Sequence, residues 1–422
     1  MSSFSVLSHK LPCLRMGLLF TEDKTMNEKN CFADLKVLDI SQGVAGPYCA
    51  NILWQNGAEV FKVEPPEGDW GRHVGTTVDG QSALSISYNV GKKSVCINAK
   101  TAAGREVIQK MAAECDVFVQ NFRPGIVEKL GLAYEDLKKI NPGIIYISIS
   151  GYGPDGPYAF APATDSVMQA ETGIMSANYD GQGNPQKIGI LMVDVLSGMY
   201  AAQQVLMALY RRRCVAAHTG EHIQLNLFDA CAAFQQSNLI EHVLNPVTIK
   251  TAVSAPNGVF NTKDGKLNVL ALNNHQFERL CKAVQKLDWL ADSRFNNNNE
   301  RMKHRALLHE ELERIVSAKT TAEWLEIFQL HEVLHAPVRN YDQVIQHPQA
   351  KFNQTVEYFE QTPGQSLPFV FMPGLQHKPA LKKAPDIGEH TVEVLKKFNF
   401  EADQITALLD ALVIQQNIKE SV

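Results

Sequence analysis

Five short apolar runs rich in β-branched residues alternate with longer segments of helical periodicity in the first 150 residues. Runs of this length and composition, each followed by a helix-like segment, are typical of parallel strands in βαβ units. The runs span residues 35–40, 58–64, 93–98, 115–121 and 143–150. The pattern predicts an α/β fold in which a large domain carries a Rossmann-like parallel sheet.

The pattern changes after residue 200. Residues 200–245 read as helical, apart from one turn, and residues 256–272 read as a β-hairpin with an Asp-Gly turn. Helices follow, and strand character returns near the end of the chain. We therefore expect an N-terminal tail at 1–30, a large domain at 31–230, a linker helix and smaller α+β domain at 231–335, and at 336–422 a linker that returns to the large domain.

Composition and charge narrow the range of partners. A formal net charge of −5 offers no basic face to a nucleic acid, so we expect no nucleic-acid partner. No apolar run approaches the ~20 residues of a membrane span, so we expect no association with a membrane. The eight cysteines form no CxxC pair, which indicates reduced thiols in a cytoplasmic protein. Residues 1–25 carry Ser, Lys and Arg before any acid, so an organellar transit peptide stays open beside a plain tail ahead of Met26.

Three predicted strand ends carry groups that suit a phosphate. Ligands of parallel sheets bind beyond the carboxyl ends of the strands, and a helix that starts there offers free N–H groups. The groups are Gly46 and Pro47 after the first strand, Lys100 after the third, and Asn121, Arg123 and Lys129 after the fourth. Each of these residues taken alone also has a plain structural explanation: glycine and proline are common in turns, and lysine and arginine are common on solvated surfaces. The segment GVAGPY lacks the GxGxxG spacing, so a dinucleotide is not favoured.

Residues 331–335 read HEVLH, which matches the HExxH pattern of zinc proteases. That chemistry needs both histidines on one face of a helix. Pro337 follows where the helix should continue, and no third histidine appears at the required spacing. We expect a helix end that runs into an extended segment, and no metal.

One acid, Asp194, stands at the front of a long apolar helical segment. The helix dipole favours a negative charge there, and Gly198 one turn later leaves the same face bare for a substrate. An Asp at this position is also an ordinary helix N-cap. The residues alone leave both roles open.

Four long blocks of the sequence resemble the class III CoA-transferases, the family of formyl-CoA transferase and carnitine CoA-transferase. The likeness covers residues 33–415 and implies acyl-CoA and carboxylic acid substrates, no permanently bound cofactor, and an interlocked, ring-like homodimer. In order, the blocks are VLDISQGVAGPYCANILWQNGAEVFKVEPPEGD, VQNFRPGIVEKLGLAYEDLKKINPGIIYISISGYGPDGPY, VDVLSGMYAAQQVLMALYRRR and TGEHIQLNLFDA.

The resemblance also implies roles for particular residues. The family nucleophile lies in a segment that reads DVLSG here, so Asp194 would carry a mixed anhydride and then an aspartyl-CoA thioester between the donor acyl-CoA and the acceptor acid. Small residues at 43–46 would supply N–H donors for the oxyanions. The implied CoA contacts are Val44, Ala45, Ile97, Asn98, Ala99, Lys100, Asn121, Phe122, Arg123 and Lys129.

Two other functions stay open within this fold. In α-methylacyl-CoA racemase a histidine acts as acid and base, and Thr164 stands in its place here; threonine cannot shuttle a proton near neutral pH. Asp165 then either lines the site or caps the next helix. A catalytically silent CoA-binding protein is the second alternative. For the acyl pocket we consider Tyr48, and for the acceptor carboxylate Arg72.

Overall fold

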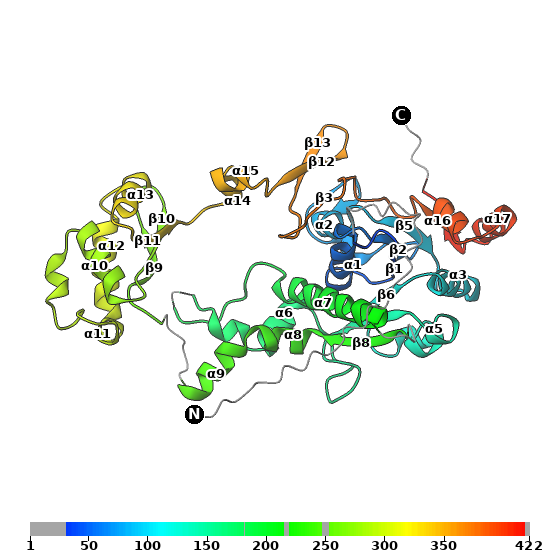
Figure 1. Cartoon of the computed structure of the whole chain (residues 1–422), viewed down its shortest axis with the longest axis horizontal. Coiled ribbons are helices and arrows are strands. Elements are labelled where there is room, and N and C mark those ends of the chain that lie inside the picture. The colour runs from blue at the N-terminus through cyan, green and yellow to red at the C-terminus, as the bar shows by residue number, and fades with distance from the viewer. Residues whose placement is uncertain (1–30, 181, 215–218, 247–252, 418–422) are drawn as a thin grey trace, which may run out of the picture.

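A seven-stranded sheet forms the centre of the larger body of the molecule (Figure 1). The computed structural model describes residues 31–180, 182–214, 219–246 and 253–417. The sheet order is β14-β5-β2-β1-β6-β7-β8, and all neighbours are parallel except β14, which pairs antiparallel with β5. The strands are β1 Lys36–Asp39, β2 Glu59–Glu64, β5 Lys93–Ile97, β6 Val117–Gln120, β7 Ile145–Ser150, β8 Glu221–Asn226 and β14 Ile414–Gln415.

The prediction of an α/β fold and of its first five parallel strands is confirmed. The prediction of a turn that ends at residue 222 and of helix from residue 223 was wrong, because residues 221–226 form β8 beside β7. Ile223 and Leu225 alternate there with polar residues, which is the two-residue period of a strand. Gly220 permits this pairing, since a Cβ atom on it would lie 1.9 Å from the carbonyl oxygen of Ile144.

Helices cover both faces of the sheet, and successive strand residues serve opposite cores. Val37 of β1 packs into the core beneath α1, α7 and α8, whereas Leu38 packs into the core beneath α3, α5, α16 and α17. The first set is α1 Ala45–Gln55, α7 Met192–Cys214 and α8 Leu227–Phe234; the second is α3 Ala102–Ala113, α5 Tyr134–Ile140, α16 Thr391–Lys397 and α17 Ala402–Asp410.

Helix α7 is the longest helix among the described residues, with 23 residues. By length and composition alone it could cross a membrane, with a mean hydropathy of 1.2 over its most apolar window, which the sequence pattern did not lead us to expect. In the structure its inward side, including Ala201 and Val205, packs into the core beneath α1.

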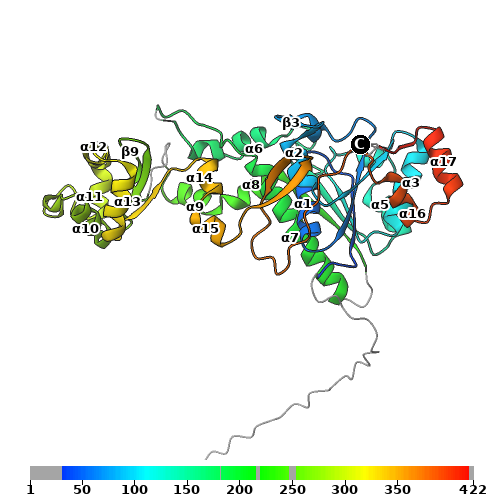
Figure 2. The same cartoon turned by 90° about the horizontal axis from the view of Figure 1, so that it is seen from above.

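A smaller body lies beside the larger one and is joined to it by two stretches of chain (Figures 1 and 2). Its antiparallel sheet, of order β11-β10-β9, packs with four helices around one hydrophobic core. The predicted hairpin at 256–272 is confirmed. The elements are β9 Asn257–Asn261, β10 Lys266–Leu270, β11 Leu334–Pro337, α10 Asn274–Ala283, α11 Asn298–Lys303, α12 Arg305–Val316 and α13 Thr321–Leu330.

Short elements complete the chain around the two bodies. Near the sheet they are β3 Thr77–Val78, β4 Gln81–Ser82, α2 Ala83–Asn89, α4 Ile126–Lys129 and α6 Asp165–Glu171. Between the bodies they are α9 Gln236–Leu244, α14 Tyr341–Ile345 and α15 Pro348–Phe352, whereas β12 Glu357–Thr362 and β13 Gln365–Phe369 pack against the core of the larger body. Figure 2 shows α9, α14 and α15 lying in this connecting region.

The HEVLH segment is not a helix. Helix α13 ends at Leu330, Glu332 adopts a left-handed conformation with φ +52°, and β11 begins at Leu334. His331 and His335 therefore do not share a helical face, in agreement with the expected helix end. Within the described ranges, no group of three His, Cys, Asp or Glu side chains is placed to hold a metal ion.

Candidate active site

Two turns meet at the carboxyl edge of the sheet, after β1 and after β6. These strands are neighbours in the sheet although β2 and β5 lie between them in sequence, so the strand order reverses at this point. Gln42 and Asn121 join the turns by two hydrogen bonds: the Gln42 N–H donates to Asn121 Oδ1 at 2.8 Å, and Asn121 Nδ2 donates to the Gln42 carbonyl at 2.7 Å. Ligands of doubly wound sheets bind at such a switch point.

A cavity of about 320 Å³ opens beside these turns. The turn after β7 and the first turns of α6 and α7 complete its wall. Of the predicted site residues, it brings together Val44, Ala45, Asn121, Phe122, Arg123, Thr164 and Asp194. Sequence reasoning missed Gln42, Ser150, Gly151 and Leu227, which also line it, because turn residues of this kind carry no signal until the strand order is known.

Asp194 reaches the cavity as the third residue of α7 and is half-buried. Its carboxylate accepts no hydrogen bond from the described residues, whereas Asp165 Oδ2 accepts the N–H groups of Val193 at 2.7 Å and of Asp194 at 3.2 Å. Asp165 thus caps α7 from the neighbouring helix, and Asp194 is not an N-cap. Burial, and secondarily the charge of Asp165, raise the pKa of Asp194 to about 7.

Backbone N–H groups for an oxyanion remain at the start of α1. The Gly43 N–H is already bound to Asp69 Oδ1 at 2.9 Å and Oδ2 at 3.1 Å. The N–H groups of Val44, Ala45 and Gly46 donate to no other group among the described residues, as is usual for a first helical turn. Val44 and Ala45 line the same cavity as Asp194.

The expectation that Gly198 leaves a bare face for substrate was wrong. A Cβ atom on Gly198 would lie 2.7 Å from the carbonyl oxygen of Ala45 and 3.1 Å from Tyr48 Cδ1. Gly198 therefore lets α7 approach α1 closely. This contact keeps Asp194, one turn earlier, next to the first turn of α1.

Five of the predicted CoA contacts do not line the cavity. Ile97, Asn98, Ala99 and Lys100 follow β5, which is separated from β1 by β2. Ile97 is buried, and exposed Lys100 pairs with Glu67 at 3.2 Å. Lys129 is exposed at the end of α4.

The structure does not support Arg72 as a partner of the acceptor carboxylate. Its guanidinium is buried, and Nε and Nη2 donate to the two oxygens of Glu64 at 2.6 and 2.7 Å. Nη2 also donates to the carbonyl of Pro385 at 3.0 Å. Tyr48 lies outside the 320 Å³ cavity, with its ring 5.3 Å from that of Tyr88.

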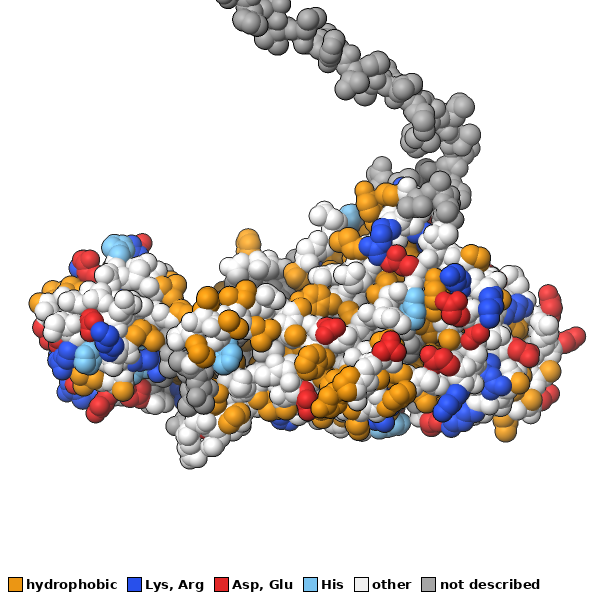
Figure 3. All heavy atoms as spheres, turned by 90° about the horizontal axis from the view of Figure 1, so that it is seen from below, with side chains coloured by type: hydrophobic (Ala, Val, Ile, Leu, Met, Phe, Trp, Pro, Cys, Tyr) orange, Lys and Arg blue, Asp and Glu red, His pale blue; other side chains and the backbone are white. Residues whose placement is uncertain are grey.

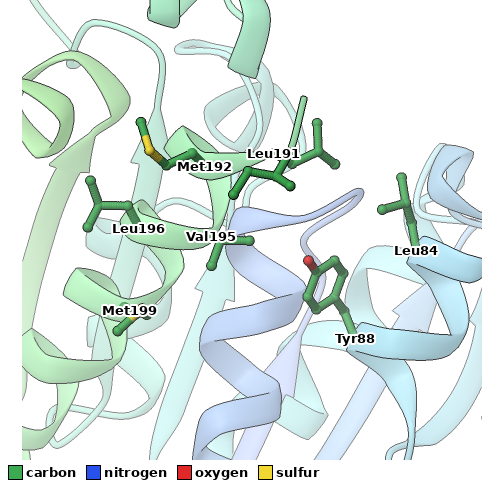
Figure 4. A pocket seen from close by; sticks show the side chains of 8 residues that line it. Leu84, Tyr88, Leu191, Met192, Val195, Leu196 and Met199 are labelled. Carbon is green, nitrogen blue, oxygen red and sulfur yellow. The ribbon is translucent and has the colours of Figure 1, made fainter. Parts of the chain in front are cut away.

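A second pocket, apolar and about 400 Å³ in volume, lies on another side of the first turns of α7 (Figure 4). Its lining is Leu84, Tyr88, Ile190, Leu191, Met192, Val195, Leu196 and Met199. Figure 4 shows the Tyr88 hydroxyl directed from α2 toward Val195. Burial raises the pKa of Tyr88 to about 12, with smaller contributions from Tyr48 and Asp194, so the hydroxyl stays a donor at neutral pH.

Comparison with known proteins agrees with this arrangement. The chain is 31% identical to the succinyl-CoA:glutarate CoA-transferase of Homo sapiens over 407 residues, covering 93% of this chain and 92% of that one. It is 34% identical to the acetyl-CoA:oxalate CoA-transferase of Acetobacter aceti over 336 residues, 78% of this chain and 86% of that one. A crystal structure of a CAIB/BAIF family protein from Brucella suis matches with a TM-score of 0.78 and 30% identity, covering 88% of this chain and all of that one.

The family model described as CoA-transferase family III matches residues 32–391, which include both turns of the switch point, Asp165 and Asp194. A doubly wound sheet, an acid at the cavity and full-length relatives that are transferases thus lead to one assignment: the chain is an enzyme that belongs to CoA-transferase family III.

Proposed function

We propose that Asp194 is the nucleophile that carries the acyl group and then CoA between the two substrates. The observation that supports this most strongly is the position of its carboxylate, which shares a cavity with the free N–H groups at the start of α1. With a pKa of about 7, the carboxylate is substantially ionised at neutral pH and more basic than an ordinary aspartate. Greater basicity makes a carboxylate a better nucleophile.

The proposed steps balance without metal or ATP. An oxygen of Asp194 attacks the donor thioester carbon, and the C–S bond breaks. CoA departs as the thiolate, and a mixed anhydride of Asp194 and the donor acid remains on the enzyme. The thiolate then attacks the Asp194 acyl carbon and expels the donor acid, which leaves an aspartyl-CoA thioester. The acceptor carboxylate reverses both steps and regenerates the Asp194 carboxylate. Each tetrahedral oxyanion would be stabilised by the N–H groups of Val44, Ala45 and Gly46.

We propose that CoA lies along the carboxyl edge of the sheet. Its thioester would sit at Val44 and Ala45, its pantetheine arm beside Asn121–Arg123, and its phosphates near Lys129 and the segment 97–100. Lys100 is available for this role, because an exposed ion pair such as that with Glu67 contributes little and exchanges readily.

A racemase role is not favoured. Thr164 Oγ1 accepts the Val167 N–H at 3.4 Å as the cap of α6, and a hydroxyl has no protonation equilibrium near neutral pH. The two identified relatives act, by their names, on succinyl-CoA with glutarate and on acetyl-CoA with oxalate. A donor and acceptor panel for this protein should therefore include these four compounds and longer aliphatic acids that fit the apolar pocket.

We further propose that a second copy of the chain completes the enzyme as a homodimer in the cytoplasm. Hydrophobic side chains gather over the middle of the molecule (Figure 3), and helices α7 to α9 carry large exposed ones. They include Met207, Tyr210, Phe234, Leu239, Ile240, Val243 and Leu244. Light scattering after gel filtration tests this proposal: a monomer at micromolar concentration contradicts it.

The nucleophile is tested by Asp194→Asn in a CoA-transfer assay read by mass spectrometry of the acyl-CoA products. Loss of transfer by at least about 10³-fold is expected. Asp229→Asn is the matched control, because Asp229 is the third residue of α8 but is exposed away from the 320 Å³ cavity. Retention of transfer in Asp194→Asn contradicts the proposal.

A further inference from the structure

Six charged side chains are buried together beneath the turn that follows β1. Each is at most 3% exposed, and the three carboxylates balance the three cations. They are Asp39, Lys62, Glu64, Asp69, Arg72 and Lys92. Burial of six charged groups in the interior of a sheet carries a large desolvation cost. Apolar side chains of similar volume would often stabilise a fold equally well or better. Its contacts therefore matter more than its contribution to stability.

The cluster forms hydrogen bonds to two residues of this turn, Ser41 and Gly43. Asp39 Oδ1 accepts the Ser41 N–H at 3.0 Å, and the Lys62 ammonium donates to the Ser41 carbonyl. Lys62 pairs with Asp69 Oδ2 at 3.0 Å, and the two Asp69 oxygens accept the Gly43 N–H. Since Asn121 binds Gln42 from the side, every residue from 41 to 43 is fixed by at least one hydrogen bond.

Asp69 also fixes the wall opposite this turn. Its Oδ1 accepts the Gly71 N–H at 2.8 Å and so caps the short helix Trp70–His73. The Trp70 ring, which lines the cavity, lies directly on Gly43, where a Cβ atom would be 2.1 Å from Trp70 Cζ2. Gly43 has φ +76°, so both its conformation and this contact require glycine.

We propose that Asp69, with Lys62 as its counterion, is a positioning residue for the transfer reaction. It sets the Gly43 peptide, and through it the direction of the N–H groups of Val44, Ala45 and Gly46 at the cavity. This inference rests on the proposed role of these groups and of Asp194. A displacement of about 1 Å in such donors is expected to slow the chemical step by about 10²-fold.

The test compares Asp69→Asn with Glu64→Gln. Both substitutions remove one charge from the same buried cluster. Glu64, however, pairs with Arg72 and accepts the Ser94 hydroxyl at 2.7 Å, and its only hydrogen bond to Asp69 is from the backbone N–H, at 3.2 Å. In Asp69→Asn, Lys62 loses the carboxylate at 3.0 Å; the Asp39 carboxylate, at 3.9 Å, and the Ser41 carbonyl remain its partners. Both variants should melt earlier than the wild type. We expect kcat to fall by about 30- to 100-fold in Asp69→Asn, with KM for acyl-CoA within about threefold, and kcat to change less than about threefold in Glu64→Gln.

A double variant, Lys62→Met with Asp69→Leu, keeps the test valid if Asp69→Asn does not fold. It removes both charges of the pair, leaves the other four balanced, and takes away the acceptor of the Gly43 N–H. The same loss of kcat is expected. A folded variant that lacks the Asp69 carboxylate and has kcat within about threefold of the wild type overturns the inference, as does an equal loss in Glu64→Gln.

The rate at which the Asp194 adduct forms in a single turnover separates the two proposals. If the wild type forms no adduct at Asp194, the proposed function itself fails. If the wild type forms it and Asp69→Asn forms it equally fast, only the positioning role of Asp69 fails.

Discussion

Replacement of Asp194 by Asn should stabilise the folded protein above neutral pH while it abolishes transfer. The folded pKa of Asp194, about 7, lies above the ordinary value of 3.8 because burial and then the charge of Asp165 disfavour ionisation. Between these two values the unfolded chain releases a proton that the folded protein retains. The stability contributed by this group therefore falls as pH rises from about 4 to about 7, and the full penalty is present above pH 7.

The size of the effect follows from the shift. About 3 pH units at ~1.36 kcal/mol per unit set an upper limit of about 4 kcal/mol. Because the side chain is half-buried and faces a cavity that water can enter, we expect about 1–2 kcal/mol. In a chain of this size that corresponds to a rise in Tm of roughly 1–2 °C at pH 8.5.

Thermal unfolding of the wild type, Asp194→Asn and Asp229→Asn at pH 5, 7 and 8.5 measures it. The gain of Asp194→Asn should be largest at pH 8.5 and small at pH 5, whereas Asp229→Asn should show no gain at any pH. A Tm of Asp194→Asn that equals or falls below the wild type at pH 8.5 would refute the reasoning, as would a gain that does not depend on pH.

Three further predictions concern the site. The kcat/KM of the wild type should rise with pH to a plateau above about 7, and Asp165→Asn should move that inflection to lower pH, measured in pH–rate profiles; an unchanged inflection contradicts the Asp165 contribution. Asn121→Ala removes both bonds to Gln42 and should raise KM for acyl-CoA by about tenfold in steady-state assays. Gly198→Ala should lower Tm and reduce kcat by about 10²-fold, because its Cβ would push α7 from Ala45; a variant with wild-type kcat contradicts the close approach.

The sheet could be predicted because most of its strands are buried on both faces and read as continuous apolar runs. Strand β8 could not, since it lies at an edge and four of its six residues are polar, so its signal merges with the helices on either side. Lys62 was a signal that the pattern contained: a lysine in the middle of β2 must find partners inside the protein. Its partners Asp39 and Asp69 lie too far away in sequence to be identified without the fold.

The candidate site was predictable only in part for a similar reason. Asp194 stood out through the family resemblance, and the structure adds that Asp165 has taken the capping role that the sequence left open. The local sequence showed the charge of Arg72 and the absent side chain of Gly198, but it did not show which neighbouring group each residue contacts. For Arg72 that neighbour is Glu64, and for Gly198 it is the backbone of Ala45.

The central claim is that Asp194 becomes covalently modified during transfer. The most direct measurement incubates the protein with acyl-CoA donors, quenches with hydroxylamine, and maps the modified peptide by mass spectrometry. The account predicts a hydroxamate at Asp194 that is absent in Asp194→Asn. An unmodified Asp194 in protein that binds CoA and transfers it would contradict the account.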